Sequence, residues 1–222
     1  MPITERADVE IRIKSGEDEK IQVQIHDLIR KGLEAEGYTD ISAPRRSSYS
    51  DRELKIDWWY EAKKDGKRVS IPIGQRCKLS TEAGDLSVHG TEPKAWEQNK
   101  LQPKYYFSGK TELLPDGTLE LIDAQFIEFE KLGFDSNKIG EYRKVMVEMA
   151  KRLGPTVCEQ ATKAGEVFKY MYRCEIHLDR EFWLYPQRKN KYSPFKTNIY
   201  FIEPYDKYPD CDIFKRHGIK VK

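Results

Sequence analysis

Apolar residues recur at the spacing of one helix face between residues 17 and 36. The recurring residues are Ile21, Ile25, Leu28, Ile29 and Leu33. Steps of three and four positions are typical of an amphipathic helix whose apolar side faces a core. Acidic residues at 17–19 favour a helix start, and Gly37 stands where helices commonly end. The pattern predicts a helix over residues 17–36.

Two strand patterns flank an Asp-Gly pair. Residues 54–61 are rich in apolar and aromatic side chains, and apolar residues alternate along 67–78. Asp65-Gly66 between them is the dipeptide most typical of a tight β-hairpin. We therefore expect 54–61 and 67–78 to be antiparallel partners.

Local patterns indicate further, shorter elements on both sides of this hairpin. Before residue 133 they are a strand at 9–13, an extended segment at 38–43, a strand at 86–89, a helix starting near 91, and strands at 105–107 and 118–129. After it they are a helix starting near 136 and strands at 167–176, 181–185 and 198–203. We expect an α/β core over 1–133 and a C-terminal α+β extension over 134–222 packed on that core.

Composition narrows the class of protein. Charged residues make up 34% of the 222 residues, yet aromatic residues reach 12%, which excludes a disordered chain. No apolar run approaches the roughly 20 residues of a membrane helix, and the first residues lack an apolar signal region. We expect a cytoplasmic protein that does not contact membranes. The net charge of +2 does not by itself indicate a nucleic-acid partner.

Motifs of several common enzyme classes are missing from the sequence. It has no Gly-rich phosphate loop, no Gly-x-Ser-x-Gly and no His-Glu-x-x-His. Cys174-x-x-His177 and Cys211-x5-His217 have spacings that would suit zinc half-sites. Reduced, buried thiols are the other interpretation, and we favour it because no Cys-x-x-Cys pair is present.

Asp57 is a carboxylate within a run of apolar and aromatic residues, between Ile56 and Trp58. Lys78 ends the other strand of the same predicted hairpin. Neighbouring strands can direct such groups to a common face, where a carboxylate binds Mg²⁺ and a lysine contacts water or phosphate.

The order helix, strand, strand, strand, helix, strand over about residues 17–110 resembles the PD-(D/E)XK (restriction-endonuclease-like) nuclease superfamily. In that family an Asp opens the second core strand, and an acidic or Gln residue and a Lys, two apart, lie on the third. The resemblance implies a mixed central sheet flanked by helices. It also implies a nucleic-acid phosphodiesterase, acting on DNA, that depends on Mg²⁺ or Mn²⁺.

The resemblance implies a role for each candidate residue. Asp57 and Gln75 would hold the metal ion, Lys78 would orient the attacking water, and Arg76 would contact the phosphate. This sequence departs from the family because Arg76, two residues before Lys78, is not acidic. Gln75 is three residues before Lys78, so strand alternation points its side chain to the opposite face from Lys78.

Several alternatives remain open for this site. A bulge at Gly74-Gln75 would bring Gln75 round to the face of Asp57, or Glu82 or Asp85 would supply the second carboxylate. Asp57 could instead pair with Lys55 or Arg68 at a strand edge. Arg76 and Lys78 could form a solvated basic face. The fold would then be a catalytically inactive module that binds nucleic acid or a protein partner.

A basic segment at 187–202 is a second candidate for contacting nucleic acid. It carries Arg188, Lys189, Lys191 and Lys196 with no acidic residue before 203. Tyr192 and Phe195 are interleaved, and this mixture suits phosphate binding and base stacking. A surface loop between two strands explains the same residues equally well. Arg45-Arg46 and Lys63-Lys64 form a further basic edge, for which ordinary surface charge is the simpler explanation.

Overall fold

The computed structural model describes residues 19–79, 91–132, 172–174, 182–186, 197–200 and 210–221. Within these ranges the chain forms two compact units. The first contains the helices α2 and α5 and the strands β1 to β4, and the second contains the helix α3 and the strands β5 to β7. None of the helices in the described ranges is long and apolar enough to cross a membrane. The predicted boundary after residue 133 stays a prediction.

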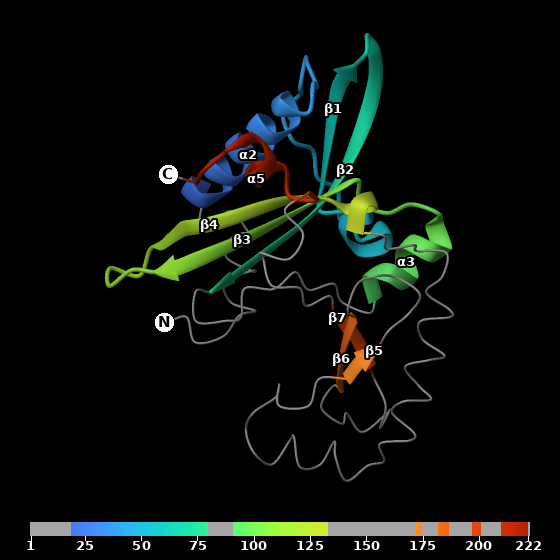
Figure 1. Cartoon of the computed structure of the whole chain (residues 1–222), viewed down its shortest axis with the longest axis vertical. Helices are drawn as coiled ribbons and strands as arrows, with labels where there is room; N and C mark the ends of the chain where they lie inside the picture. Colours follow the sequence, from blue (N-terminus) through green and yellow to red (C-terminus); the bar gives the residue numbers. More distant parts are fainter. Residues whose placement is uncertain are drawn as a thin grey trace. The chain divides into compact units, whose positions relative to one another are not determined.

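The first unit is built on a four-stranded mixed sheet (Figure 1). Its strands, in spatial order, are β1 (Trp58–Lys64), β2 (Lys67–Leu79), β3 (Tyr105–Leu113) and β4 (Leu119–Glu128). β1 and β2 are antiparallel, β2 and β3 parallel, and β3 and β4 antiparallel. The predicted α/β class with a mixed sheet is therefore confirmed, as are the strands expected near 105–107 and 118–129.

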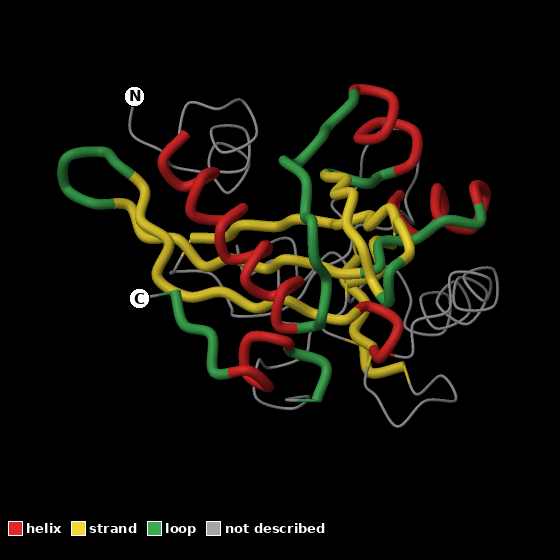
Figure 2. The backbone as a smooth tube through the Cα atoms, turned by 90° about the horizontal axis from the view of Figure 1, so that it is seen from above, coloured by secondary structure: helices red, strands yellow, loops and turns green. Residues whose placement is uncertain are grey.

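The predicted amphipathic helix is α2 (Glu19–Ala35), and it lies across the strands of this sheet (Figure 2). All five residues of its apolar stripe are buried in one cluster with side chains from the four strands. Gly32 allows the close approach, because a Cβ there would lie 2.6 Å from the Phe126 ring. Gly37 ends the helix region with φ +81°, a conformation that glycine adopts without strain.

The predicted hairpin is confirmed, with β1 and β2 paired from Lys64 and Lys67 outwards. Asp65 and Gly66 both have positive φ, 52° and 74°, as a two-residue hairpin turn requires. The first strand was expected at 54–61, and this part of the prediction is wrong. A π-helical turn, η1 (Ser50–Leu54), occupies its start. Lys55 then takes a left-handed conformation so that its N–H bonds to the carbonyl of Ser50, and this prevents an earlier strand start.

The segment predicted to be extended at 38–43 runs antiparallel to β1. Main-chain bonds join Thr39 to Lys63, Ser42 to Glu61, and Arg45 to Trp59. The segment thus connects the end of α2 to the turn η1 and covers the outer edge of β1.

A short helix near the end of the chain, α5 (Ile213–His217), completes the core of the first unit. The Asp212 side chain caps it by accepting the Phe214 N–H at 3.0 Å. The Phe214 ring packs at 5.6 Å from that of Phe126 and at 6.3 Å from that of Phe107. Residues 210–221 therefore belong with the sheet, although they lie far from it in sequence.

An ion cluster fixes the last turn of α5. Arg216 bonds to Glu36 at 2.6 Å and to Glu128 at 3.2 Å. His217 Nε2 lies 2.9 Å from the same Glu36 oxygen. Burial acts to raise the pKa of Glu36, but the bonds and charges of His217 and Arg216 lower it below its usual value. Glu36, just after α2, thereby joins α2 to α5.

The second unit contains α3 (Thr91–Asn99), which starts where the sequence predicts. It also contains an antiparallel sheet of three short strands, in which β6 is central. These strands, β5 (Tyr172–Cys174), β6 (Phe182–Pro186) and β7 (Thr197–Tyr200), fall within or beside the predicted runs. The strands expected at 9–13 and 86–89 and the helix expected from 136 lie outside the described residues.

Candidate functional site

Asp57 lies immediately before β1 and holds β1 and β2 together at that end. Its main-chain N–H donates to the carbonyl of Ile73 at 3.1 Å. Its carboxylate Oδ2 accepts the main-chain N–H of Gln75 at 2.7 Å. The residue is buried, with 8% of its surface exposed, so its carboxylate needs such donors. Asp57 and Gln75 are thus brought together, but through the main chain of Gln75.

The side chain of Gln75 bonds to a tryptophan. Its amide Oε1 accepts the indole N–H of Trp58 at 2.7 Å, and the residue is 3% exposed. β2 pairs with β3 residue for residue from Ile73 to Leu79, without the bulge considered at Gly74-Gln75. Gln75 therefore keeps the alternation of Ile71 and Ile73, which belong to the cluster under α2.

His26 of α2 contacts the Trp58 ring. The edge of the His26 ring meets Trp58 with ring centroids 4.5 Å apart, and its Nδ1 bonds to the hydroxyl of Tyr60. Burial lowers the pKa of His26 to about 4, against a lesser opposing effect of Asp27, so the ring is neutral at pH 7. Burial also raises the pKa of the Tyr60 hydroxyl. A ring contact from His26 to Trp58 and a hydrogen bond from Trp58 to Gln75 thus connect α2 to the residue whose main chain binds Asp57.

These contacts are not predicted from the sequence, in which His26 is one of four histidines and belongs to none of the motifs considered. The available signal was strand alternation: Trp58 and Tyr60, two apart, share the face that α2 covers. Which helix residue meets them depends on how α2 crosses the sheet, and that is not a local property of the sequence.

Arg76 points to the other face of the sheet and is also buried, with 8% exposed. Its Nε donates to the hydroxyl of Tyr106 at 3.2 Å. The Tyr106 ring stacks on Phe129 and crosses Gly74 so closely that a Cβ on Gly74 would lie 2.5 Å from it. Glycine is thus required for Tyr106 to reach Arg76. The alternative of a solvated basic face is wrong for Arg76.

Arg76 belongs to a row of buried polar residues across three strands. It pairs with Ser108 on β3, and Ser108 pairs with Gln125 on β4. Ser108 is fully buried, and 6% of Gln125 is exposed. Buried polar groups in such a row have to satisfy one another or the groups that cover them. On the face opposite α2, these three residues therefore form a buried polar row across β2, β3 and β4.

Lys78 lies in β2, and its Cα pairs with that of Lys110 on β3. The structure describes the main chain of Lys78 but not its side chain. Arg188, Lys189 and Lys191 lie outside the described residues, as do Glu82 and Asp85. Their predicted roles therefore stay predictions.

The described residues contain no group of three or more His, Cys, Asp or Glu side chains placed to hold a metal ion. Within the same ranges Cys77 and Cys211 are buried free thiols, in agreement with the reduced state expected for them. His217 Nε2 lies against Glu36, and the zinc half-site considered at Cys211 and His217 stays a prediction. Of the acidic residues considered for the site, Asp57 is the one that lies within the described residues.

Two buried polar side chains are thus placed at neighbouring positions of β2: the Asp57 carboxylate bonds to the Gln75 main chain, and the next residue, Arg76, bonds to Tyr106. A carboxylate can bind a cation, and a guanidinium can bind an anion. No protein-family model matches the chain, and neither a curated protein nor a solved structure does.

Proposed function

We propose that this protein is a Mg²⁺- or Mn²⁺-dependent nucleic-acid phosphodiesterase of the PD-(D/E)XK type, acting on DNA. The observation that carries the proposal is the Asp57 carboxylate, which is bonded to the main chain of β2 one residue from Arg76. The chain order also supports it: α2, the extended segment, β1, β2, α3 and β3 follow the order expected for such a core. Asp57 immediately precedes the second extended element.

Asp57 would hold the metal ion. A common set of Mg²⁺ ligands is one or two carboxylates, completed by water and substrate phosphates. A carboxylate has roughly four acceptor positions, so one bond to the Gln75 N–H is compatible with a metal ion. When bound, the ion would polarise the phosphodiester and lower the pKa of a coordinated water. Glu82 and Asp85 are the candidates for a second ligand, because the Gln75 side-chain amide bonds to Trp58 on the face that α2 covers.

Two basic residues would act on the substrate. The Arg76 guanidinium, held in place by Tyr106, would donate hydrogen bonds to a phosphate oxygen and stabilise its charge. Lys78 would orient the attacking water from its place two residues further along β2. The bond from the Gln75 N–H to the Asp57 carboxylate holds that carboxylate against β2, the strand that carries both basic residues.

The test is cleavage of supercoiled plasmid and of labelled single-stranded DNA with Mg²⁺, Mn²⁺ or EDTA. We expect metal-dependent cleavage that Asp57→Asn and Lys78→Ala reduce by at least about a hundredfold. Asp57→Asn keeps an oxygen that accepts the Gln75 N–H, so it tests the charge and not the fold. Lys110→Ala, beside Lys78 on β3, is the matched control and should leave cleavage unchanged.

The proposal fails if purified, folded protein cleaves neither substrate with either metal. It also fails if Asp57→Asn cleaves as fast as the original protein, since the activity would then come from another site or a contaminant.

A second candidate is a nucleic-acid-binding module of the same fold without catalysis. It is favoured by Arg76 at the position where the family has an acid, and by Trp58 occupying the Gln75 amide. This candidate predicts salt-dependent DNA binding without cleavage, and binding that Arg76→Ala weakens.

A further inference from the structure

Three exposed aromatic or basic residues lie on the segment that leads into Asp57. Tyr49 is 63% exposed, one of two large hydrophobic side chains that the described residues leave this open to solvent. Arg45 and Arg52 are exposed on the same segment. We name these three residues the Tyr49 surface.

The main chain beneath the Tyr49 surface is held firmly by Trp59. Trp59 exchanges two main-chain hydrogen bonds of 2.8 Å with Arg45, and its indole N–H donates to the Ser50 hydroxyl. Ser50 is 3% exposed, and its carbonyl accepts the Ile56 N–H at 3.1 Å. Trp59 therefore holds Arg45 directly and holds Ser50, the residue after Tyr49, which in turn bonds to Ile56 just before Asp57.

Arg46 makes a second set of contacts that hold this segment in place. The Arg46 side chain bonds to Asp51 at 2.7 Å and places its guanidinium 5.7 Å from the centre of the Trp58 ring. Such a preformed segment loses little conformational entropy when a ligand binds.

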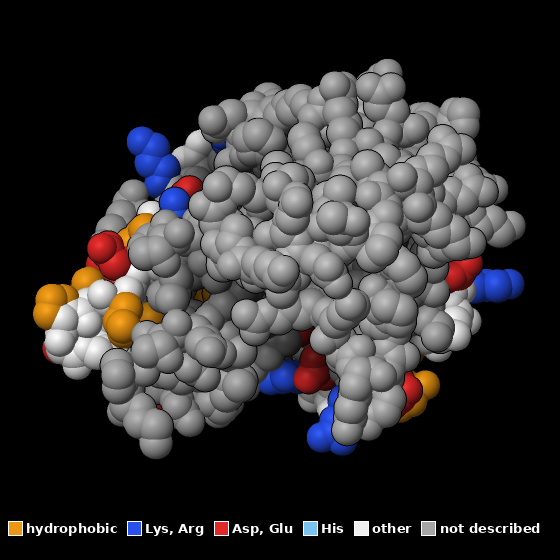
Figure 3. Space-filling view, turned by 90° about the horizontal axis from the view of Figure 1, so that it is seen from below, with side chains coloured by type: hydrophobic (Ala, Val, Ile, Leu, Met, Phe, Trp, Pro, Cys, Tyr) orange, Lys and Arg blue, Asp and Glu red, His pale blue; other side chains and the backbone are white. Residues whose placement is uncertain are grey.

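The basic residues of the Tyr49 surface are not part of an overall excess of positive charge on the protein. Figure 3 shows basic and acidic side chains together among the coloured residues of one face, in keeping with the net charge of +2. Arg45 is paired with Glu61, but 67% of its side chain is exposed and such pairs contribute only about 0–1 kcal/mol. A phosphate can therefore replace Glu61 as the partner of Arg45.

We infer that the Tyr49 surface binds unpaired nucleotides, with Tyr49 stacking on a base while Arg45 and Arg52 contact phosphates. In a duplex each base is covered by its neighbours, so a protein ring can stack only on a base that is unpaired or splayed out. The inference rests on the proposed function: it makes single-stranded or flapped DNA the substrate delivered to Asp57.

The experiment measures binding of a fluorescein-labelled oligo-dT to the full chain in EDTA, where cleavage cannot occur. Tyr49→Phe keeps the ring and should bind like the original protein. Tyr49→Leu keeps the size but not the stacking, and should weaken binding about tenfold. Binding to a blunt duplex should respond equally little to both variants.

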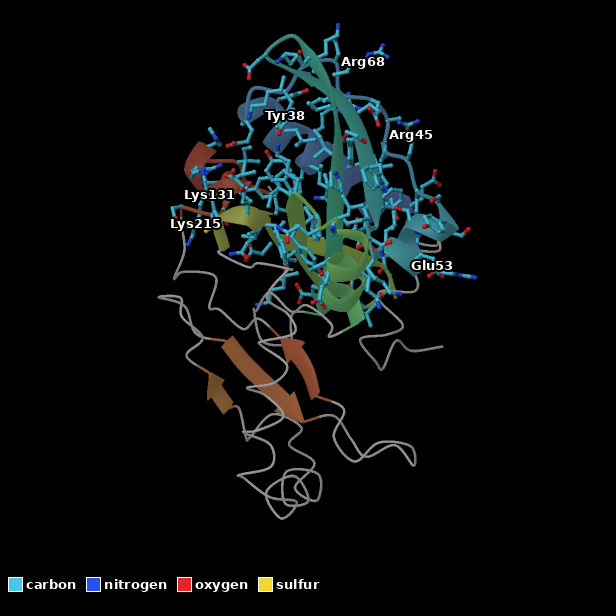
Figure 4. The ribbon with its side chains drawn as sticks, turned by 90° about the vertical axis from the view of Figure 1, so that its right-hand side faces the viewer. Tyr38, Arg45, Glu53, Arg68, Lys131 and Lys215 are labelled. Atoms are coloured by element: carbon cyan, nitrogen blue, oxygen red, sulfur yellow. The ribbon has the colours of Figure 1, made fainter. Side chains whose placement is uncertain are left out.

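The salt dependence of binding tests the proposed phosphate contacts independently of the stacking. Arg52→Ala should reduce the slope of log affinity against log salt by about 0.7, the value for one phosphate contact on a single strand. Arg68→Ala is the matched control, because Figure 4 shows Arg68 near the tip of the β1–β2 hairpin, apart from Arg45 and Glu53. Glu53→Gln, which removes an acid beside Arg52, should tighten binding.

The inference is overturned if Tyr49→Leu and Tyr49→Phe bind the oligonucleotide equally well, or if the duplex is bound as tightly as the single strand. Either result is independent of catalysis. Cleavage without any effect of Tyr49 would refute the inference alone, and Tyr49-dependent binding without cleavage would refute the proposed function alone.

Discussion

Single buried polar residues determine how β1 and β2 meet. Asp57 accepts a main-chain N–H from β2, and Trp58, the next residue, donates to a β2 side chain. The two residues point to opposite faces, so the sheet is fixed from both sides at the place where the candidate site lies. The Asp57 bond is buried and the Trp58 bond is partly buried, and a buried hydrogen bond is costly to break because its groups are left without a partner.

His26 should make the stability of the protein depend on pH. Its pKa falls from 6.5 to about 4 in the folded chain because burial disfavours the charged ring. Between these values the unfolded chain binds a proton that the folded chain does not, so stability falls as pH drops from 6.5 towards 4. We expect a loss on the order of 2 kcal/mol, since the ring is only partly buried.

His26→Gln removes the titrating group and keeps a partner for the Tyr60 hydroxyl. Urea unfolding at a series of pH values should therefore show a flatter pH dependence for the variant. An unchanged slope in this range would mean that His26 ionises normally in the folded chain.

At the scale of elements, α2 and α5 lie on the same sheet and are joined to each other by charge. In Figure 4 Lys215 of α5 lies near Lys131, beyond the end of β4, on the side away from Arg45 and Glu53. The Glu36–Arg216 contact therefore holds an end of the fold that is distant from the Tyr49 surface.

Glu36→Gln should weaken this contact by about 1 kcal/mol at pH 7. The pKa of Glu36 is lowered in the folded chain, so its stabilisation is present above the usual value of 4.5 and is lost as pH falls below it. Thermal unfolding should show a deficit for the variant at pH 7 that disappears in acid. Glu34→Gln, an exposed glutamate of α2, is the control and should show no deficit.

The elements whose patterns are local were predicted well. The stripe of α2 and the Asp-Gly turn each specify their structure within a few residues, and both are confirmed. The turn η1 was missed because it depends on contacts that are distant in sequence. The Lys55 N–H bonds to the Ser50 carbonyl, and the Ser50 hydroxyl is held by the Trp59 indole. At the candidate site, Asp57 and Gln75 could be selected from the sequence, but the bond from the Gln75 main-chain N–H to the carboxylate could not, since that contact depends on the register between two strands.

At the scale of the molecule, the first unit depends on a residue far along the chain. Phe214→Ala should destabilise this unit by about 3–5 kcal/mol, because the ring fills space between Phe107 and Phe126. Urea unfolding followed by tryptophan fluorescence measures the change, and Lys220→Ala, at an exposed position nearby, is the control. A loss below about 1 kcal/mol would show that α5 is only peripheral to the core.

The position of α5 has a consequence for folding during synthesis. The Phe126 N–H donates to the side chain of Asp212, 86 residues later in the chain. A ribosome that adds about 5–20 residues per second needs about 4–17 s to make that interval. During this interval the strands β1 to β4 have been made, but the Phe214 ring that packs on Phe126 has not. The apolar surface around Phe126 would therefore be open to a chaperone until α5 is translated.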